Sequence, residues 1–201
     1  ALNVSNVNAA STTISVTTTD VSKYVAIADF TVTLAKTFPL NVVGDESYAT
    51  LYLPFDVTTT GATKAYYATT ANNGSVQLTE TASEGKEIPA RTAVVLVNSD
   101  GAASTILDTG SGLTPAVSES DNLLKGTLVP MSLDLGDATP YYAMGKKDGK
   151  IGFYKFNNGG TTSITLGANK SYLETTASAN AVKGFAFDLD PGDETALKDL
   201  K

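Results

Sequence analysis

Residues 48–57 have the sequence Tyr48-Ala49-Thr50-Leu51-Tyr52-Leu53-Pro54-Phe55-Asp56-Val57. Successive side chains of a β-strand point to opposite faces. One face of this stretch would therefore be wholly apolar and would consist of Ala49, Leu51, Leu53, Phe55 and Val57. The opposite face would carry the two tyrosines with Thr50, Pro54 and Asp56. We predict a half-buried strand whose apolar face covers a core, and we expect the rest of the chain to add strands to that core.

Two-residue turn signals separate further pairs of alternating segments. Asn73-Gly74 lies between 62–69 and 75–81, and Asp148-Gly149 lies between 140–144 and 151–156. Both dipeptides tolerate positive φ and are typical of β-hairpins. The continuous apolar run 88–97 is typical of a strand that is buried on both faces. These patterns predict an all-β fold with minimal helix, either an antiparallel β-sandwich or a flattened barrel of many short strands.

The second half of the chain repeats the first in outline. The two motifs that carry this repeat are Ile88-Pro89-Ala90-Arg91-Thr92 and Leu166-Gly167-Ala168-Asn169-Lys170. Each has an aliphatic residue, a turn residue and an alanine, followed by two polar residues and a strand, and a Tyr-Tyr pair precedes each one. We therefore predict an internal pseudo-repeat with halves at about 48–97 and 140–189.

A main β domain is expected over residues 37–190. Residues 1–36 are rich in Thr, Ser, Asn and Val, and we predict that they form β structure, either as part of the sandwich or as the end of a preceding module. A change of parity among their apolar residues predicts a bulge near Ala28-Asp29. Residues 191–201 are predicted to form an acidic tail or a short helix capped by Asp193.

The composition disfavours several classes of site. The chain has 201 residues, a formal net charge of −7, and no cysteine, histidine or tryptophan. Thiolates and imidazoles are therefore missing for metal binding and for acid–base chemistry, and we expect no catalytic residue, no metal site and no cofactor. The lysines are scattered, which argues against a nucleic-acid partner. The chain has no apolar run of about 18 residues, so we expect no transmembrane segment.

Three polar clusters match parts of known site patterns. Residues 83–86 (Ser-Glu-Gly-Lys) and 120–122 (Ser-Asp-Asn) match two parts of the signature of penicillin-recognising serine enzymes, but the third part, Lys-Thr-Gly, does not occur in the chain. We interpret both as polar loops. The four carboxylates between Asp188 and Glu194 offer oxygen ligands for Ca²⁺, but their spacing fails the helix–loop–helix pattern, which favours a solvated acidic tail.

Several tyrosines are candidates for a ligand-contact surface. Tyr48 and Tyr52 share the polar face of the strand at 48–57, and Tyr66 and Tyr141 lie in neighbouring predicted strands. On an exposed face these rings would stack against sugar rings or anchor another protein. The alternative is that the tyrosines cover the sandwich and expose only their hydroxyl groups at its rim.

Five motifs occur in an order that resembles a known module. They are Tyr48-Ala49-Thr50-Leu51-Tyr52-Leu53-Pro54-Phe55, Ile88-Pro89-Ala90-Arg91-Thr92, Gly152-Phe153-Tyr154-Lys155, Ala168-Asn169-Lys170-Ser171-Tyr172-Leu173 and Lys183-Gly184-Phe185. Over about residues 38–190 the chain resembles the β-rich module that recurs near the C-termini of secreted and surface-exposed proteins of gut Bacteroidetes. The resemblance implies an exported or cell-surface β domain without catalytic residues. Arg91 and Gly167 depart from the pattern, which tends to have Asn and Pro there, and both departures concern turn geometry.

We expect a non-catalytic module of a secreted or cell-surface protein, which acts in adhesion, in binding a glycan or another surface protein, or as a spacer. The alternative is a fimbria-like subunit that assembles by donating a strand from residues 12–34. A third hypothesis is a histidine-free carbohydrate-active enzyme with two facing carboxylates, for which Asp45, Glu46 and Asp56 are candidates. The first residues lack the features of a signal peptide, so either a processing boundary precedes Ala1 or the chain is not exported.

Overall fold

The computed structural model describes residues 36–72, 74–156, 160–175 and 182–189. The predictions for the bulge near Ala28-Asp29, for a donated strand at 12–34 and for a tail at 191–201 lie outside the described residues. Within them the regular structure is almost all β-strand. The one helical element there, α1 (Ala82–Gly85), is a single turn in which Ser83 and Glu84 have left-handed φ values of 54° and 58°. The all-β prediction is confirmed.

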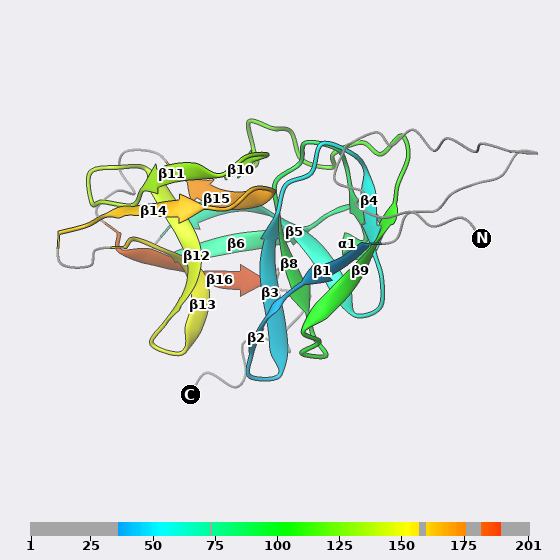
Figure 1. Cartoon of the computed structure of the whole chain (residues 1–201), viewed down its shortest axis with the longest axis horizontal. Helices are drawn as coiled ribbons and strands as arrows, with labels where there is room; N and C mark the ends of the chain where they lie inside the picture. The colour runs from blue at the N-terminus through cyan, green and yellow to red at the C-terminus, as the bar shows by residue number, and fades with distance from the viewer. Residues whose placement is uncertain (1–35, 73, 157–159, 176–181, 190–201) are drawn as a thin grey trace, which may run out of the picture.

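The strands form three sheets (Figure 1). One has the order β10-β15-β12-β13-β16-β6-β5-β8-β3-β2, and the bounds of these ten strands, in that order, are Leu124–Thr127, Lys170–Glu174, Tyr141–Lys147, Lys150–Tyr154, Gly184–Leu189, Ser75–Glu80, Thr63–Asn72, Val94–Asn98, Glu46–Leu51 and Asn41–Val43. Another has the order β1-β9-β4-β7, with bounds Lys36–Pro39, Ser104–Thr109, Val57–Thr59 and Glu87–Ile88. The last pairs β11 (Met131–Asp134) with β14 (Ser163–Leu166).

Two units of six consecutive strands make the same pairings. In the first unit, residues 46–98, β3 pairs with β8, β4 with β7, and β5 with both β6 and β8. In the second unit, residues 124–174, β10 pairs with β15, β11 with β14, and β12 with both β13 and β15. The fold thus contains an internal repeat, but its second copy starts earlier and ends earlier than 140–189. The predicted second half was matched on the Tyr-Tyr pair and the turn motif, so it leaves out β10 and β11, which precede that pair.

β16 lies between the two units in the ten-stranded sheet. It pairs antiparallel with β13 of the second unit and parallel with β6 of the first unit, and this parallel pair departs from the antiparallel pattern predicted from the sequence. The close pairing with β13 requires Gly152, because a Cβ atom there would lie 2.1 Å from the carbonyl oxygen of Phe185. Equivalent strands of the two units lie at equal distances from β16 in the strand order, with β13-β12-β15 on one side and β6-β5-β8 on the other.

The ten-stranded sheet curls into a half-barrel whose two ends approach each other. Just after β3, the amide of Tyr52 donates a hydrogen bond to the carbonyl oxygen of Asn169 at 3.2 Å. The hydroxyl of Ser171 in β15 donates to the carbonyl oxygen of Val94 in β8 at 3.0 Å. The curled sheet encloses a first core of buried side chains, among them Tyr66, Leu78, Val95, Tyr142, Phe153 and Phe185.

A second core lies on the other face of β3, β8 and β5, beneath the four-stranded sheet on the right of Figure 1. Ala49 and Leu51 belong to this second core. The other face of β3 is also buried, with Tyr48 only 8 % exposed. The prediction of a half-buried strand is therefore wrong, because the strand ends at Leu51 and lies between two cores. Beyond the end of β3, Val57 is buried in the second core and Leu53 packs against it, whereas Phe55 is 36 % exposed, so four of the five predicted apolar side chains lie in or against this core.

Other local predictions are confirmed. β8 is buried over its whole length, as its continuous apolar sequence predicts. β12 and β13 pair across the turn Asp148-Gly149, whose φ values are 51° and 81°. Positive φ at both turn residues is the geometry that makes such dipeptides favourable. β5 and β6 likewise pair with Asn72 opposite Ser75.

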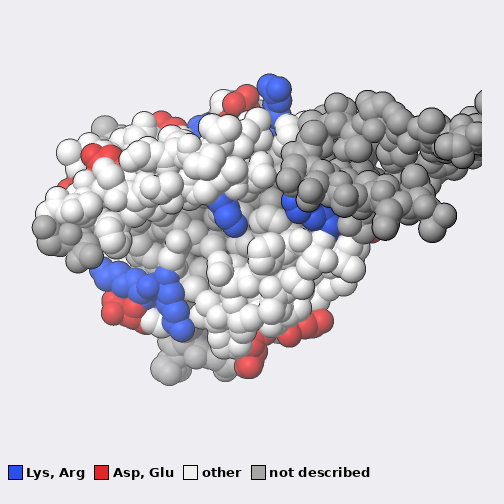
Figure 2. All heavy atoms as spheres, in the orientation of Figure 1, with Lys and Arg blue, Asp and Glu red and all other residues white. Residues whose placement is uncertain are grey.

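None of the helical structure within the described ranges is long and apolar enough to cross a membrane. On the face drawn in Figure 2, lysine and arginine side chains form separate groups and no continuous stripe. The expectation that nucleic acid is not a partner stays a prediction.

Candidate functional site

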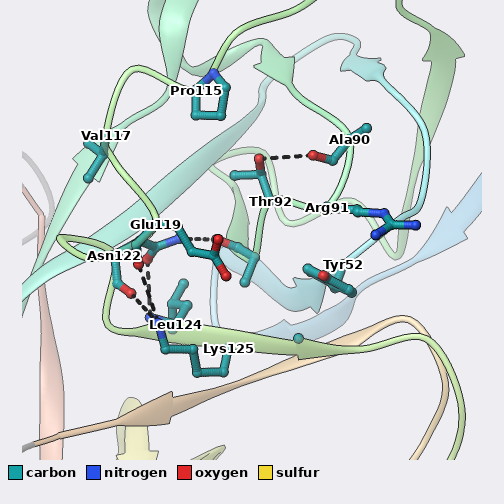
Figure 3. A pocket seen from close by; sticks show the side chains of 12 residues that line it. Tyr52, Ala90, Arg91, Thr92, Pro115, Val117, Glu119, Asn122, Leu124 and Lys125 are labelled. Atoms are coloured by element: carbon teal, nitrogen blue, oxygen red, sulfur yellow. Dashed lines mark hydrogen bonds between the residues drawn. The ribbon is translucent and has the colours of Figure 1, made fainter.

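A pocket of about 330 Å³ opens between the first unit and the start of the second (Figure 3). Three segments build it: the residue after β3, the turn before β8, and the loop that leads into β10. The lining residues are Tyr52, Ala90, Arg91, Thr92, Ala93, Pro115, Val117, Glu119, Asn122, Leu124, Lys125 and Gly126. The volume is at the small end of the range for small-molecule sites, roughly 300–1,000 Å³.

The Tyr52 ring forms one wall of this pocket. The ring lies against the backbone of β10, where a Cβ atom on Gly126 would be only 2.0 Å from Cγ of Tyr52. Only glycine therefore allows the ring to lie there. Tyr52 packs at the margin of the first core and is half-buried, so part of its ring stays exposed in the pocket. The pocket thus has a fixed aromatic surface.

Arg91 lies beside Tyr52 at one end of the pocket (Figure 3). Its backbone has a φ of 56°, a left-handed conformation that is uncommon for a residue with a long side chain. Its amide donates a hydrogen bond to the carbonyl oxygen of Leu53 at 2.7 Å, which fixes the turn. The side chain is exposed, and its guanidinium makes no hydrogen bond or ion pair with the part of the chain that the structure describes. The pocket therefore contains a cation that is available to a ligand.

The loop before β10 forms the opposite wall and is fixed by polar side chains. The hydroxyl of the buried Tyr67 accepts a hydrogen bond from the amide of Ala116 at 3.2 Å. Lys125 donates from its ammonium group to the carbonyl oxygens of Glu119 and Asn122, both at 3.3 Å. Glu119 itself projects from this wall, across the pocket from Arg91 (Figure 3).

Asn122 is the most buried polar side chain of that wall, with 5 % exposure. Its Nδ2 donates to the carbonyl oxygen of Ala93 at 2.9 Å. Its Oδ1 accepts hydrogen bonds from the amides of Ala68 at 3.4 Å and Leu124 at 3.1 Å. These bonds join the loop to β5 and to the turn before β8. The match of 120–122 to a catalytic signature is therefore explained by a structural role for Asn122.

Asp56 joins two walls of the pocket from outside it. Oδ1 accepts a hydrogen bond from the amide of Ala90 at 2.7 Å, and Oδ2 accepts one from the amide of Leu113 at 3.0 Å. These two bonds lower the pKa of the Asp56 carboxyl below its ordinary value of 3.8. The Asp56 carboxylate therefore acts as a structural acceptor that holds the turn before β8 and the loop at Leu113 together.

We expect Asp56→Asn to reduce the loss of stability in acid. The folded protein binds this proton at a lower pH than the unfolded chain, so stability decreases as the pH falls from about 4 through the folded pKa. Asparagine does not titrate, and its amide group cannot accept the second hydrogen bond. The melting temperature between about pH 5 and pH 2 checks this prediction. Asp148→Asn at the β12–β13 turn is the control, and an equal pH dependence in both variants would contradict the assignment.

The four predicted ligand-contact tyrosines do not form one surface. Tyr48 and Tyr66 are 8 % and 4 % exposed and lie in the first core, so the expectation that they are on an exposed face is wrong. The curled sheet covers the face of β3 that the sequence assigned to solvent. Tyr141 lies in β12 with its ring centroid 5.6 Å from that of Tyr172, and it does not line the pocket. Tyr52 is the one of the four that lines it.

The Ser83 and Lys86 pair has other partners. The hydroxyl of Ser83 donates to Oε1 of Glu87 at 2.7 Å. The ammonium group of Lys86 donates to the carbonyl oxygens of Gly61 at 2.6 Å and Thr63 at 2.7 Å. Burial lowers the pKa of Lys86. Its ammonium group, however, is bonded to backbone carbonyl oxygens at the start of β5 and not to the Ser83 hydroxyl.

The candidate acidic residues do not line the pocket. Asp45, Glu46 and Asp56 are not among the lining residues of the pocket. Among the described residues that line it, Glu119 is the only one with a carboxylate. Within the described ranges no three acidic residues are grouped closely enough to hold a metal ion. Asp188 lies in β16, and the remaining carboxylates of the predicted acidic cluster are outside the described residues.

A partly exposed aromatic ring, two cations and one carboxylate around a small cavity can bind a polar ligand reversibly. Sequence reasoning found Tyr52 but missed Arg91 and the loop at 115–126. The available signal was Arg91 itself, which occupies a turn position where the resemblance predicts Asn. The resemblance to the Bacteroidetes module stays a prediction. The chain matches no protein-family model, no curated protein and no solved structure among those with which it was compared.

Proposed function

We propose that this chain is a non-catalytic module of a secreted or cell-surface protein and that it binds a glycan in the pocket at Tyr52. The observation that carries the proposal is the Tyr52 ring, which is held against Gly126 with part of its surface exposed in a polar cavity. The faces of sugar rings carry C–H groups that pack against aromatic rings, while their hydroxyl groups require hydrogen-bonding neighbours. Adhesion to a glycan-coated surface is the role that such binding would serve.

Two further observations support glycan binding over hydrolysis. Glycoside hydrolysis requires two carboxyl groups on opposite sides of the scissile bond, whereas the described lining of this pocket contains one, Glu119. Arg91 and Glu119 lie at opposite walls (Figure 3), where both can form hydrogen bonds with sugar hydroxyl groups. A volume of about 330 Å³ suits one sugar ring or the end of a short chain.

A glycan array followed by isothermal titration calorimetry tests the proposal. We expect Tyr52→Ala to weaken binding of the best array ligand about tenfold or more, because the stacking surface is lost. Tyr141→Ala is the matched control, since that ring is half-buried but lies outside the pocket. The absence of any glycan binding by the unaltered chain, equal losses in both variants, or hydrolysis of the bound sugar would contradict the proposal.

A further inference from the structure

We infer that the pocket selects acidic glycans and that Arg91 binds a carboxylate of the sugar. This inference rests on the proposed function and adds the chemical class of the ligand. Its support comes from a comparison that the molecule itself provides, between equivalent turns in the two units.

The turn before β8 and the turn before β15 have the same geometry. Arg91 has a φ of 56° and Asn169 has a φ of 60°. The amide of Arg91 donates to the carbonyl oxygen of Leu53 at 2.7 Å, just beyond β3. The amide of Asn169 donates to the carbonyl oxygen of Thr127 at the same distance, at the end of β10. Because β3 and β10 are equivalent strands, the two turns serve the same structural purpose.

The two residues differ in how well they suit this backbone. Asparagine is among the few residues that adopt left-handed φ readily, whereas arginine is not. The second unit therefore shows that the turn needs no arginine, and that the turn in the first unit is built from a less favourable residue. Residues held in such conformations cluster at ligand sites, where a functional demand outweighs the strain.

The side chains also differ in their surroundings. Arg91 lines the pocket with an exposed guanidinium that has no described partner. Asn169 is absent from the lining, although its carbonyl oxygen accepts a hydrogen bond from the amide of Tyr52. The strained residue is thus found at the turn that opens into the cavity.

The charges around the pocket define what Arg91 would bind. The ammonium group of Lys125 already donates to two carbonyl oxygens of the loop, whereas the guanidinium of Arg91 has no side-chain partner among the described residues and keeps all its donors for a ligand. A guanidinium forms paired hydrogen bonds with a planar carboxylate. Glu119 on the opposite wall would repel a second negative charge on the ligand, but it would accept hydrogen bonds from hydroxyl groups of the sugar. The fitting ligand is therefore a saccharide whose carboxylate lies at the Arg91 end.

Recognition of this ligand must be local. The chain has a net charge of −7, so an acidic glycan gains no general electrostatic attraction to the protein. Any preference for acidic over neutral sugars must then come from a specific cation at the binding site.

The test is calorimetry on the full 201-residue chain with two pairs of probes. One pair is an oligogalacturonide and its methyl ester, and the other is sialyllactose and lactose, so that uronic and sialic acids are distinguished. We expect at least one acidic probe to bind and its neutral partner to bind much more weakly. Arg91→Asn should weaken binding of the acidic probe about tenfold or more, because charged hydrogen bonds are lost. The melting temperature of this variant should equal or exceed that of the unaltered chain. Lys146→Asn removes one positive charge at the β12–β13 turn and should change neither quantity.

The outcomes separate this inference from the proposed function. Binding of neutral sugars that Tyr52→Ala abolishes and Arg91→Asn leaves unchanged would overturn the inference and support the proposed function. Equal losses in Arg91→Asn and Lys146→Asn would assign acidic binding to general electrostatics and would also overturn it. No binding of any probe, together with an empty glycan array, would overturn both.

Discussion

Replacing Phe185 with alanine is expected to lower the free energy of unfolding by about 4 kcal/mol. The side chain is fully buried in β16, and its ring centroid lies 4.9 Å from that of Tyr142 in an edge-to-face arrangement. β16 is hydrogen-bonded on both sides, to β13 and to β6, so the backbone cannot move inward to fill the cavity. Such a loss would be a large fraction of the roughly 5–15 kcal/mol that stabilises a typical domain.

Urea denaturation of the unaltered chain and of the Phe185→Ala variant measures this loss. Phe156→Ala is the control, because that ring is 40 % exposed and its removal should change the free energy of unfolding by less than about 0.5 kcal/mol. Similar values for the two variants would show that β16 does not insert between the two units in solution.

Replacing Asn122 with alanine is expected to lower the free energy of unfolding by about 3 kcal/mol. The carbonyl oxygen of Ala93 and the amides of Ala68 and Leu124 would all lose their side-chain partner in a buried place. An unsatisfied buried polar group is more costly than the net value of the hydrogen bond. The loop wall of the pocket would then separate from β5 and from the turn before β8.

Denaturation and amide hydrogen exchange check this prediction together. The Leu124 amide should exchange faster in the variant, while amides in the β12–β13 hairpin should be unaffected as long as the fold persists. Ser120→Ala is the matched control in the same loop, because the Ser120 hydroxyl is exposed and its one hydrogen bond within the described residues is to the hydroxyl of Ser118. Stability of Asn122→Ala within about 0.5 kcal/mol of the unaltered chain would contradict the structural role of this side chain.

Local features of the fold were predictable because short-range chemistry determines them. Asp148-Gly149 forms a tight hairpin turn since both residues adopt positive φ, and β8 is buried because its sequence is apolar without interruption. The half-buried strand was mispredicted for a physical reason. Alternation shows which side chains share a face, but whether a tyrosine-bearing face is covered depends on the curl of a sheet that is closed by strands more than a hundred residues away.

The pocket was less predictable than the fold for the same reason. It depends on contacts between distant residues, such as the bond from the Ala116 amide to Tyr67 and the bond from Asn122 to Ala93. No sequence period predicts such pairs. Tyr52 was identified because alternation placed it on the polar face of the strand predicted at 48–57, but the position of its ring depends on the absence of a side chain at Gly126. The sequence indicated Arg91 only as a departure from the asparagine that the resemblance predicts at this turn.

The position of β16 also determines when the fold can be completed during synthesis. It is the last strand of the described chain, yet it occupies the middle of the largest sheet. Until residues 184–189 leave the ribosome, β6 and β13 each present an unpaired edge. Nascent chains of this protein therefore pass through a stage at which two open strand edges are available for mispairing between neighbouring chains, and this stage ends only when β16 is added.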